Sequence, residues 1–571
     1  MLRRLITVGL MLPLLSPLAR ADDPPWVARS KTGMVASDST EASQIGADVL
    51  TQGGNAFDAA IATSCALAVS RPQSTGLGGG GFLVAYVAKE KRFVALDFRE
   101  VAPAGATRER YAQLAAEAGD GPPPSIYGGN ASGVPGLVAG LAEIHRRYAT
   151  RPWRDLVLPA SKLADTGFRA DDTYEGACRK ALKDIDKWPQ LKEQHAELYR
   201  TLLGGGKGPA DGDTVKRPDL AEALRILASD GPHAFYEGPL GAALVKANQA
   251  AGGVLTTEDL AAYRVREREP LHAMFNGHEI IAMPPPSSGG VCIIETLNIL
   301  SAFAADFPGG LPAMRNDNYP PALVTALKHS FADRARWLGD PDFCRVPVAL
   351  LTSPAYAAKL IEQCPTQLDD FGSPQLPDDQ GTSHFSIIDK NGNVVAFTET
   401  INGNFGSFVV AAPYGIVLNN QMDDFATDPG KPNLFGLIQG EGNAVAPGKR
   451  PLSCMSPTIV LKDGQPVLVL GASGGPLIIT SVLQVLLNVV EFRLPLDEAL
   501  TAVRIHHQWR PDEVNFDRDP PGALVETLKG AGHTISTRRR TGIVQAIQVL
   551  PDGTLVGASD VRKGGRPAGA K

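Results

Sequence analysis

A threonine at position 382 opens a stretch in which hydroxyl, amide and carboxylate side chains recur at short spacings. Residues 380 to 425 read QGTSHFSIIDKNGNVVAFTETINGNFGSFVVAAPYGIVLNNQMDDF. A threonine hydroxyl is a weak nucleophile unless a neighbouring base takes its proton, and a free α-amino group has a pKa near neutrality that suits this task. Cleavage after Gly381 would give Thr382 such a group. We therefore predict that Gly381-Thr382 is a cleavage site and that Thr382 is a nucleophile.

Two strand-like runs and a linker position this threonine. The runs SHFSII and VVAFTETI flank the turn at 389–393, Asp-Lys-Asn-Gly-Asn, which is a strong hairpin signal. The acidic, proline-rich sequence LDDFGSPQLPDDQ runs directly into Gly381 and predicts an exposed linker. The sequence thus predicts a hairpin whose first strand begins at the nucleophile.

A second candidate nucleophile lies in the sequence GASGG at 471–475, between the strand-like PVLVL and the helix-like IITSVLQVLLNVV. In this context G-x-S-x-G is the nucleophile elbow of α/β-hydrolases, with Ser473 as the nucleophile. The preceding sequence lacks the repeated strand–helix units of that fold. A more economical role belongs to Gly474 and Gly475, whose backbone N–H groups at the start of a helix suit an oxyanion hole.

The remaining chain mixes helices and strands. Alanine-rich and amphipathic runs predict helices at 40–50 and 56–69 and through most of 133–253. The glycine-rich TGLGGGGF follows a helix and opens two strands, which is the wrong context for a dinucleotide-binding loop, so we attribute its glycines to close backbone packing. Strands and helices alternate without a regular βαβ period, and hairpins dominate the last third. The predicted fold class is α+β, with antiparallel sheets covered by helices.

Composition and the N-terminus narrow the function class. The formal net charge of −6 gives no reason to expect a nucleic-acid partner. Residues 1–21, MLRRLITVGLMLPLLSPLARA, have two arginines, an apolar run and an Ala-Arg-Ala site, and they predict a cleaved signal peptide and a periplasmic or secreted protein. A membrane anchor is the alternative, but the run is short and Pro13 and Pro17 interrupt it.

The six cysteines are too sparse for a disulfide scaffold. Cys344 and Cys364 could form a local bridge in an oxidising compartment, and the sequence leaves both states open. No cysteine or histidine spacing is typical of zinc, and we interpret His506 and His507 as structural. We expect neither a metal nor a cofactor.

From Arg71 almost to its C-terminus the chain resembles the γ-glutamyltransferases (γ-glutamyltranspeptidases), which are N-terminal-nucleophile hydrolases. The matching stretches are RPQSTGLGGGGF, DFRE, GTSHFSIIDKNGN, NNQMDDF, KRPLSCMSPTIV, GASGG and HHQW. The resemblance implies a four-layer αββα sandwich of stacked antiparallel sheets. It also implies a precursor that cleaves itself into a large subunit, 22–381, and a small catalytic subunit, 382–571, which stay together as one intertwined heterodimer.

The resemblance assigns the catalytic roles residue by residue. Thr382 would cleave the precursor and then form the γ-glutamyl-enzyme. Thr400 would lie beside the new α-amino group and orient it. Gly474 and Gly475 would form the oxyanion hole.

The resemblance also implies a clamp for the amino-acid end of the donor. Arg99 and Ser453 would hold its α-carboxylate, and Asn402, Gln421 and Asp424 would hold its α-amino group. These residue types suit the two charges, since a guanidinium and a hydroxyl donate to an anion, and carboxylate and amide oxygens accept from a cation.

Three residues depart from the family pattern. Ser383 follows Thr382 where bacterial members often have another threonine. Cys454 stands where many members have a second serine, so a weak thiol replaces one hydroxyl donor to the carboxylate. Phe435 takes a position in the predicted lid, roughly 428–448, that is tyrosine in some bacterial members.

The resemblance therefore predicts an exported enzyme that transfers or hydrolyses γ-glutamyl groups from glutathione or related compounds, with water, an amino acid or a dipeptide as acceptor. Three alternatives stay open. They are an acylase of the same fold that cleaves glutaryl-type amides, a Ser473 hydrolase, and a processed but inactive binding protein.

Overall fold

The computed structural model describes residues 23–315, 317–363, 381–427 and 430–571. The predicted signal peptide, Cys364 and the linker up to residue 380 lie outside these ranges. Cys344 forms no disulfide with another described cysteine, and its bridge to Cys364 stays a prediction because Cys364 is outside the described ranges. Within the described ranges, no helix is long and apolar enough to cross a membrane.

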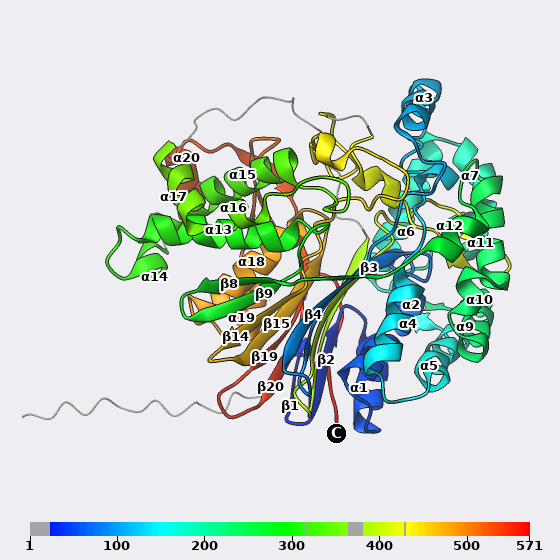
Figure 1. Ribbon diagram of the computed structural model, residues 1–571, viewed down its shortest axis with the longest axis horizontal. Coiled ribbons are helices and arrows are strands. Elements are labelled where there is room, and N and C mark those ends of the chain that lie inside the picture. Colours follow the sequence, from blue (N-terminus) through cyan, green and yellow to red (C-terminus); the bar gives the residue numbers. More distant parts are fainter. Residues whose placement is uncertain (1–22, 316, 364–380, 428–429) are drawn as a thin grey trace, which may run out of the picture.

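Two seven-stranded sheets, in which every neighbouring pair of strands is antiparallel, form the centre of the molecule (Figure 1). The first sheet has the order β1 (Val27–Ser30), β20 (Leu555–Ser559), β19 (Ile543–Val549), β15 (Gln465–Ser473), β14 (Thr458–Lys462), β9 (His278–Ala282), β8 (Leu271–Phe275). The second has the order β21 (Ala568–Gly569), β2 (Gly33–Ser37), β10 (Thr382–Asp389), β11 (Val394–Thr400), β3 (Gly80–Val87), β4 (Arg92–Phe98), β7 (Arg266–Arg268).

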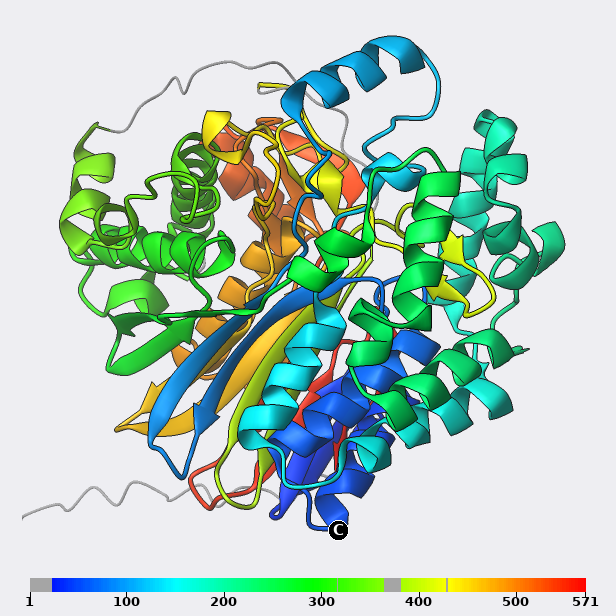
Figure 2. The same ribbon diagram turned by 45° about the vertical axis from the view of Figure 1, so that its right-hand side comes forward.

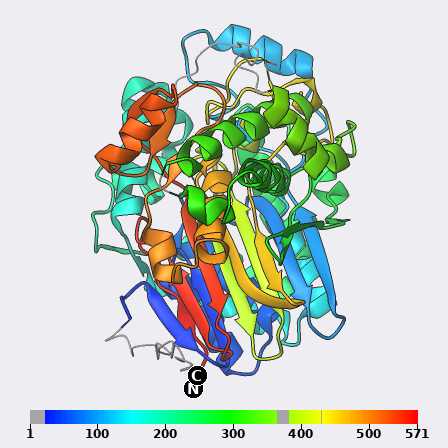
Figure 3. The same ribbon diagram turned by 90° about the vertical axis from the view of Figure 1, so that its left-hand side faces the viewer.

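Helices cover the outer face of each sheet. α1 (Thr40–Thr51), α2 (Ala56–Ser70) and α4 (Leu137–Tyr148) pack on the second sheet (Figure 2). α13 (Gly289–Ala304), α18 (Leu477–Val490) and α19 (Leu496–Thr501) pack on the first (Figure 3). Because β10 and β11 also face β15 and β19 across the interior, the layers run helix, sheet, sheet, helix. The predicted α+β class and its stacked antiparallel sheets are confirmed.

The remaining elements surround this sandwich. The other helices are α3 (Arg108–Ala118), α5 (Trp153–Thr166), α6 (Asp172–Lys187), α7 (Gln190–Gln194), α8 (Ala196–Thr201), α9 (Pro218–Asp230), α10 (His233–Tyr236), α11 (Pro239–Ala250), α12 (Thr257–Ala262), α14 (Gly310–Met314), α15 (Tyr319–Trp337), α16 (Val348–Leu351), α17 (Pro354–Gln363) and α20 (Gly522–Gly530). Short strands form three small sheets, β5 (Phe168–Arg169) with β6 (Thr214–Val215), β12 (Val410–Ala411) with β13 (Ile416–Val417), and β16 (Ile505–His506) with β17 (Val514–Phe516) and β18 (Ile535–Arg539). Four 3₁₀ turns complete the set, η1 (Gly129–Ala131), η2 (Gly204–Gly206), η3 (Gln421–Asp424) and η4 (Glu441–Asn443).

The predicted hairpin is confirmed as β10 and β11. Asp389 closes its turn, since its carboxylate accepts hydrogen bonds from the Asn391 and Asn393 backbone amides at 2.8 and 3.0 Å. The second carboxylate oxygen accepts from the Ala56 amide at the start of α2. One aspartate therefore fixes both the hairpin turn and the adjoining helix.

Alternation along β10 directs its side chains to two different layers. Phe385 and Ile387 pack into the core shared with α1 and α2. Ser386 points the other way and donates to backbone oxygens of the first sheet. Because side chains two residues apart share a face, Thr382 lies on the side of the first sheet. The hairpin thus directs the predicted nucleophile, Thr382, into the space between the two sheets.

The glycine run before β3 serves close backbone packing, as predicted. A Cβ atom on Gly79 would lie 2.1 Å from the Thr400 carbonyl oxygen, and one on Gly81 would lie 2.3 Å from that of Thr398. Only glycine allows β3 to approach β11 this closely. The run therefore supports the strand that ends at Thr400.

Glu399 is a buried acid at the centre of this packing. It lies on the α2 side of β11, where its carboxyl accepts hydrogen bonds from Ser64 and Thr75. Burial raises the pKa of Glu399 to about 8, although both hydroxyls oppose the shift. The folded state therefore favours the protonated acid. The stabilisation from this group is complete below the ordinary carboxyl pKa and is lost as the pH rises through about 8.

We expect Glu399→Gln to flatten the pH dependence of stability, because glutamine mimics the neutral acid at every pH. Between pH 6 and pH 9 the melting temperature of the natural protein should fall by several degrees more than that of the variant. Differential scanning calorimetry of both proteins across this range checks the prediction. Other buried acids titrate equally in the two proteins, so parallel curves would contradict the assignment to Glu399.

Candidate active site

Thr382 is the first residue of β10 and lies directly opposite Thr400 of β11. Their hydroxyl oxygens are 3.1 Å apart, and Thr382 is 5% exposed. The register of the hairpin therefore pairs the predicted nucleophile with the residue predicted to assist it.

The peptide bond before Thr382 is held by the same threonine pair. The Thr400 hydroxyl donates to the Gly381 carbonyl oxygen at 2.7 Å and accepts from the Asn402 amide at 2.8 Å. Since Thr400 uses its proton on Gly381, the Thr382 hydroxyl donates to the Thr400 oxygen. The arrangement polarises the carbonyl that Thr382 would attack in a cleavage reaction.

Gly381 fits this position only because it has no side chain. A Cβ atom there would lie 2.8 to 3.0 Å from the carbonyl oxygens of Asn402, Gly403 and Gln73. Any larger residue would push the bond away from Thr400.

Lys563 is a site residue that the sequence reasoning missed. Its ammonium donates to the Thr382 carbonyl oxygen at 2.7 Å and to the Ser473 hydroxyl at 3.2 Å, and it pairs with Asp38 at 2.7 Å. A single lysine near the C-terminus gives no sequence signal for this role. Lys563 therefore fixes the backbone of the predicted nucleophile.

The α/β-hydrolase interpretation of Ser473 is wrong. Ser473 does end a strand before a helix, but β15 lies between β14 and β19 in an antiparallel sheet. A nucleophile elbow requires a parallel doubly wound sheet. The Ser473 hydroxyl instead accepts the hydrogen bond from Lys563.

Gly474 and Gly475 form the turn between β15 and α18. Both have positive φ angles, 123° and 56°, which favour glycine. Neither amide donates a hydrogen bond within the part of the chain that the structure describes. Gly475 lines the same cavity as Thr382, so a free N–H at the positive end of α18 is available to a developing oxyanion.

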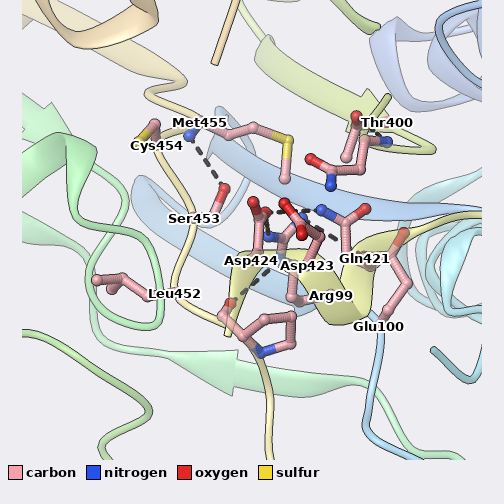
Figure 4. Close-up of polar contacts among 12 residues, drawn as sticks. Arg99, Glu100, Thr400, Gln421, Asp423, Asp424, Leu452, Ser453, Cys454 and Met455 are labelled. Atoms are coloured by element: carbon pink, nitrogen blue, oxygen red, sulfur yellow. Dashed lines mark hydrogen bonds and ion pairs between the residues drawn. The ribbon is translucent and has the colours of Figure 1, made fainter. Parts of the chain in front are cut away.

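The two halves of the predicted clamp touch each other (Figure 4). Arg99, 1% exposed at the end of β4, forms an ion pair with Asp424 and donates to the Pro451 carbonyl oxygen at 3.2 Å. Asp424 also accepts from the Gln421 amide at 2.8 Å. The adjoining Glu100 is buried, and burial raises its pKa to about 7 although Arg99 opposes the shift. Arg99 is therefore neutralised mainly by Asp424.

Asn402 and Ser453 complete the group. The Asn402 side chain donates to the Asn420 carbonyl oxygen at 3.0 Å, and the Ser453 hydroxyl accepts from the Met455 amide at 3.1 Å. The structure brings nearly all the predicted site residues to one cavity, whose lining includes Arg99, Thr382, Thr400, Asn402, Gln421, Asp424, Ser453, Cys454 and Gly475.

The cavity measures about 20 Å³, which is enough for a water molecule and too small for a glutamyl group. Donor binding must therefore separate side chains that now touch, the Arg99–Asp424 pair among them.

Cys454 is oriented differently from the other clamp residues. Its sulfur accepts a hydrogen bond from Arg334 Nη2 at 3.4 Å and lies 4.0 Å from the Ser288 hydroxyl. In Figure 4 it points away from Arg99 and Asp424. Burial raises the pKa of the Cys454 thiol, with Arg334 opposing the shift. The predicted thiol donor to the carboxylate is thus engaged with an arginine that the sequence reasoning did not consider.

The described part of the predicted lid, residues 430–448, closes over the site. A Cβ atom on Gly475 would lie 2.6 Å from the ring of Phe435. Gln508 donates to the backbone oxygens of Phe435 and Gly436, and Asp423 accepts from the Leu434 amide at 2.6 Å. Burial raises the pKa of Asp423 to about 7. The lid is thus held by polar contacts to its backbone, without a tyrosine hydroxyl.

The paired histidines are held by hydrogen bonds. His506 contacts the Thr480 hydroxyl at 3.0 Å and Gln508 at 2.9 Å, and His507 contacts Asp512 at 3.1 Å. Across the described ranges, no group of three or more histidine, cysteine or acidic side chains is arranged to hold a metal ion.

Comparison with known proteins identifies the family. The model of the family described as Gamma-glutamyltranspeptidase matches residues 42–570. The chain belongs to this family. It is 42% identical over 542 residues to the glutathione hydrolase proenzyme of Escherichia coli (strain K12), covering 94% of this chain and 91% of that protein.

Two of the similar proteins are acylases by name. The chain is 35% identical over 551 residues to the Acylase ACY 1 proenzyme of Pseudomonas sp. (strain SE83), covering 95% of this chain and 94% of that protein. The crystal structure of a cephalosporin acylase from Bacillus halodurans superimposes with a TM-score of 0.83 at 27% identity, covering 98% of this chain and 99% of that one.

Proposed function

We propose that this chain is an exported γ-glutamyltransferase and glutathione hydrolase that matures by cutting itself between Gly381 and Thr382. The observation that carries the proposal is the contact of Thr400 with both the Thr382 hydroxyl and the Gly381 carbonyl oxygen. The proenzyme names of the similar proteins support it.

Maturation would begin when the Thr382 hydroxyl oxygen attacks the Gly381 carbonyl carbon. The Thr400 hydroxyl, 2.7 Å from the carbonyl oxygen, would stabilise the negative charge that develops there. Breakage of the C–N bond transfers the acyl group to the Thr382 oxygen and gives its nitrogen the proton. Water then hydrolyses this ester, which leaves a carboxylate on Gly381 and a free α-amino group on Thr382.

Turnover would use the same hydroxyl with a new base. The α-amino group of Thr382 takes the hydroxyl proton as the oxygen attacks the γ-carbonyl carbon of the donor. The Gly474 and Gly475 amides would bind the oxyanion, and the proton passes to the leaving amine. Water, an amino acid or a dipeptide then takes the γ-glutamyl group from Thr382.

Interleaving of the two proposed subunits favours a stable heterodimer. The second sheet places β10 and β11, which follow the cleavage site, between β2 and β3, which precede it. The cut chains would therefore share backbone hydrogen bonds across β10–β2 and β11–β3.

A glutaryl-type acylase is the second candidate function, favoured by the likeness to acylases. Glutaryl donors lack the α-amino group, so they have no cation for Asp424 to bind. The buried Asp424 carboxylate beside Thr382 favours the γ-glutamyl donor. Purified protein should therefore turn over γ-glutamyl-p-nitroanilide faster than glutaryl-p-nitroanilide. A faster glutaryl rate would favour the acylase, and turnover of neither donor would contradict both candidates.

Asp424→Asn should separate these donors. Loss of the carboxylate removes a charged hydrogen bond to the α-amino group, so kcat/KM for γ-glutamyl-p-nitroanilide should fall about 10- to 100-fold. The glutaryl anilide should be affected much less, since the freed Arg99 still binds its carboxylate. Initial rates with both donors check this expectation, and an equal loss for both would show that Asp424 serves the structure alone.

We also propose that the protein is exported to the periplasm or secreted, because residues 1–21 have the pattern of a signal peptide. Mass spectrometry of the large subunit from its native host tests this. A chain that begins at Asp22 supports export, and one that retains the first 21 residues contradicts it.

A further inference from the structure

A second buried arginine lines the cavity that holds Thr382 and Arg99. Arg334 extends from α15, on the side of the first sheet, and is 2% exposed. Arg99 enters the same cavity from the opposite side, at the end of β4 in the second sheet. The two guanidinium groups therefore reach one small space from different layers of the fold.

The contacts of Arg334 leave part of its guanidinium unused. Nε donates to the Ser288 hydroxyl at 3.0 Å, and Nη2 donates to the Cys454 sulfur at 3.4 Å. Nη1 is buried and has no hydrogen-bond partner among the residues described. No acidic side chain in the described ranges forms an ion pair with Arg334, whereas Arg99 is paired with Asp424 and lies 3.6 Å from the Glu100 carboxyl.

An unpaired buried cation is costly, because protein interiors solvate charge poorly. The Cys454 thiol does not offset the charge, since burial raises its pKa above the ordinary value and keeps it neutral. Ser288 is neutral as well. The positive charge of Arg334 is therefore matched by no described neighbour, and an anion in the cavity would match it.

Arg334 is also coupled to the predicted carboxylate-binding loop. The Ser288 hydroxyl that accepts from Arg334 donates in turn to the Ser453 carbonyl oxygen at 2.6 Å. A continuous hydrogen-bonded series thus joins Arg334 to Ser288 and Ser288 to Ser453, and the two end residues line the cavity. An anion held by the Ser453 hydroxyl would lie in the cavity that Arg334 also lines.

We infer that Arg334 is a substrate-binding residue whose unpaired positive charge joins Arg99 in holding the α-carboxylate of the donor. The inference rests on the proposed function, since it assigns a residue to the same donor site. It gives each charge of the amino-acid end its own partner. The carboxylate would lie with Arg334, Arg99 and Ser453, and the ammonium would lie with Asp424 once donor binding has separated it from Arg99.

The test compares Arg334→Gln with Arg336→Gln on three donors. Arg336 is on the same helix, is exposed and stacks on Trp337, so its loss is a matched control for the charge change. γ-Glutamyl-p-nitroanilide carries both charges, glutaryl-p-nitroanilide carries only the carboxylate, and 4-aminobutyryl-p-nitroanilide carries only the amine. The readouts are kcat and KM for each donor.

Arg334→Gln should lower kcat/KM for the two carboxylate donors about 10- to 100-fold, mainly by raising KM. For the 4-aminobutyryl donor, kcat/KM should change less than about threefold. Arg336→Gln should leave kcat/KM unchanged for all three donors. Equal losses on all three donors would overturn the inference, because Arg334 would then only hold the Ser453 loop in place.

A second variant keeps the test decisive if the first one does not fold or mature. If Arg334→Gln does not mature, Arg334→Lys replaces it. This variant keeps the charge but loses the planar guanidinium group. It should therefore lower kcat/KM for the two carboxylate donors about 3- to 10-fold and leave kcat/KM for the 4-aminobutyryl donor nearly unchanged. An equal loss on all donors again overturns the inference.

Failure of the proposed function gives a different result, namely a natural protein that turns over none of the donors. Calorimetry with L-glutamate and 4-aminobutyrate then decides the role of Arg334. A preference of the natural protein for L-glutamate that Arg334→Gln abolishes supports the inference. A preference that survives the substitution, or no binding of L-glutamate, overturns it.

Discussion

Thr382→Ala should give a single uncut chain with no measurable turnover of γ-glutamyl-p-nitroanilide. Alanine removes the hydroxyl oxygen that we propose attacks the Gly381 carbonyl carbon, so neither the ester nor the free α-amino group should form. Loss of a catalytic nucleophile typically costs a factor of roughly 10,000 or more. A denaturing gel and an activity assay on the same preparation measure both effects.

Thr382→Ser is the matched control, because serine keeps the hydroxyl and loses only the methyl group. It should be cut and should retain activity at a reduced rate. The methyl group lies in a buried position, 5% exposed, so its loss loosens the geometry without removing the chemistry. A Thr382→Ala protein that is cut normally and turns over the donor would rule out Thr382 as the nucleophile.

Thr400→Val should slow maturation roughly 100-fold or more, since it removes the donor to the Gly381 carbonyl oxygen and the partner of the Thr382 hydroxyl. Valine keeps the shape of threonine, so the strand should persist. The fraction of uncut chain, followed on denaturing gels after synthesis, gives the rate. The small amount of cut protein should also show reduced kcat.

Thr398→Val is the control for loss of a buried hydroxyl on the same face of β11. Thr398 contacts His384 at 2.8 Å and does not touch the scissile bond. It should mature at close to the natural rate. If both variants mature equally slowly, the effect of Thr400 comes from the strand and not from its contact with Gly381.

Local sequence was sufficient to predict the catalytic hairpin. The runs around Asp389 and Gly392 specify a tight turn, and the turn sets the register that pairs Thr382 with Thr400. The glycines at 474 and 475 were also predictable, because a strand, two glycines and an apolar helix specify a turn with free amides. In both cases the signal lies within about 20 residues of the site.

The charge pairing of the donor site was not predictable from sequence. Arg99 and Asp424 are 325 residues apart, and their contact depends on how β4 and η3 meet in the folded chain. Residue types predicted that each would bind an opposite charge, yet not that they would bind each other. Lys563 and Arg334 carry no local pattern at all, since an arginine inside an amphipathic helix is ordinarily a surface residue.

The orientation of Cys454 was also not predictable from local sequence, because it depends on contacts that form only in the folded chain. Sequence placed it beside Ser453 and therefore in the carboxylate site. The loop that carries both residues alternates its side chains, so the Ser453 hydroxyl and the Cys454 sulfur point in different directions (Figure 4). The thiol reaches Arg334, whose position is set by α15.

N-terminal sequencing of the smaller chain in purified, active protein tests the central claim most directly. The account predicts two chains, of which the smaller begins Thr-Ser-His-Phe, the sequence from Thr382. A smaller chain that begins at any other residue, or an uncut chain that turns over γ-glutamyl-p-nitroanilide, would contradict it.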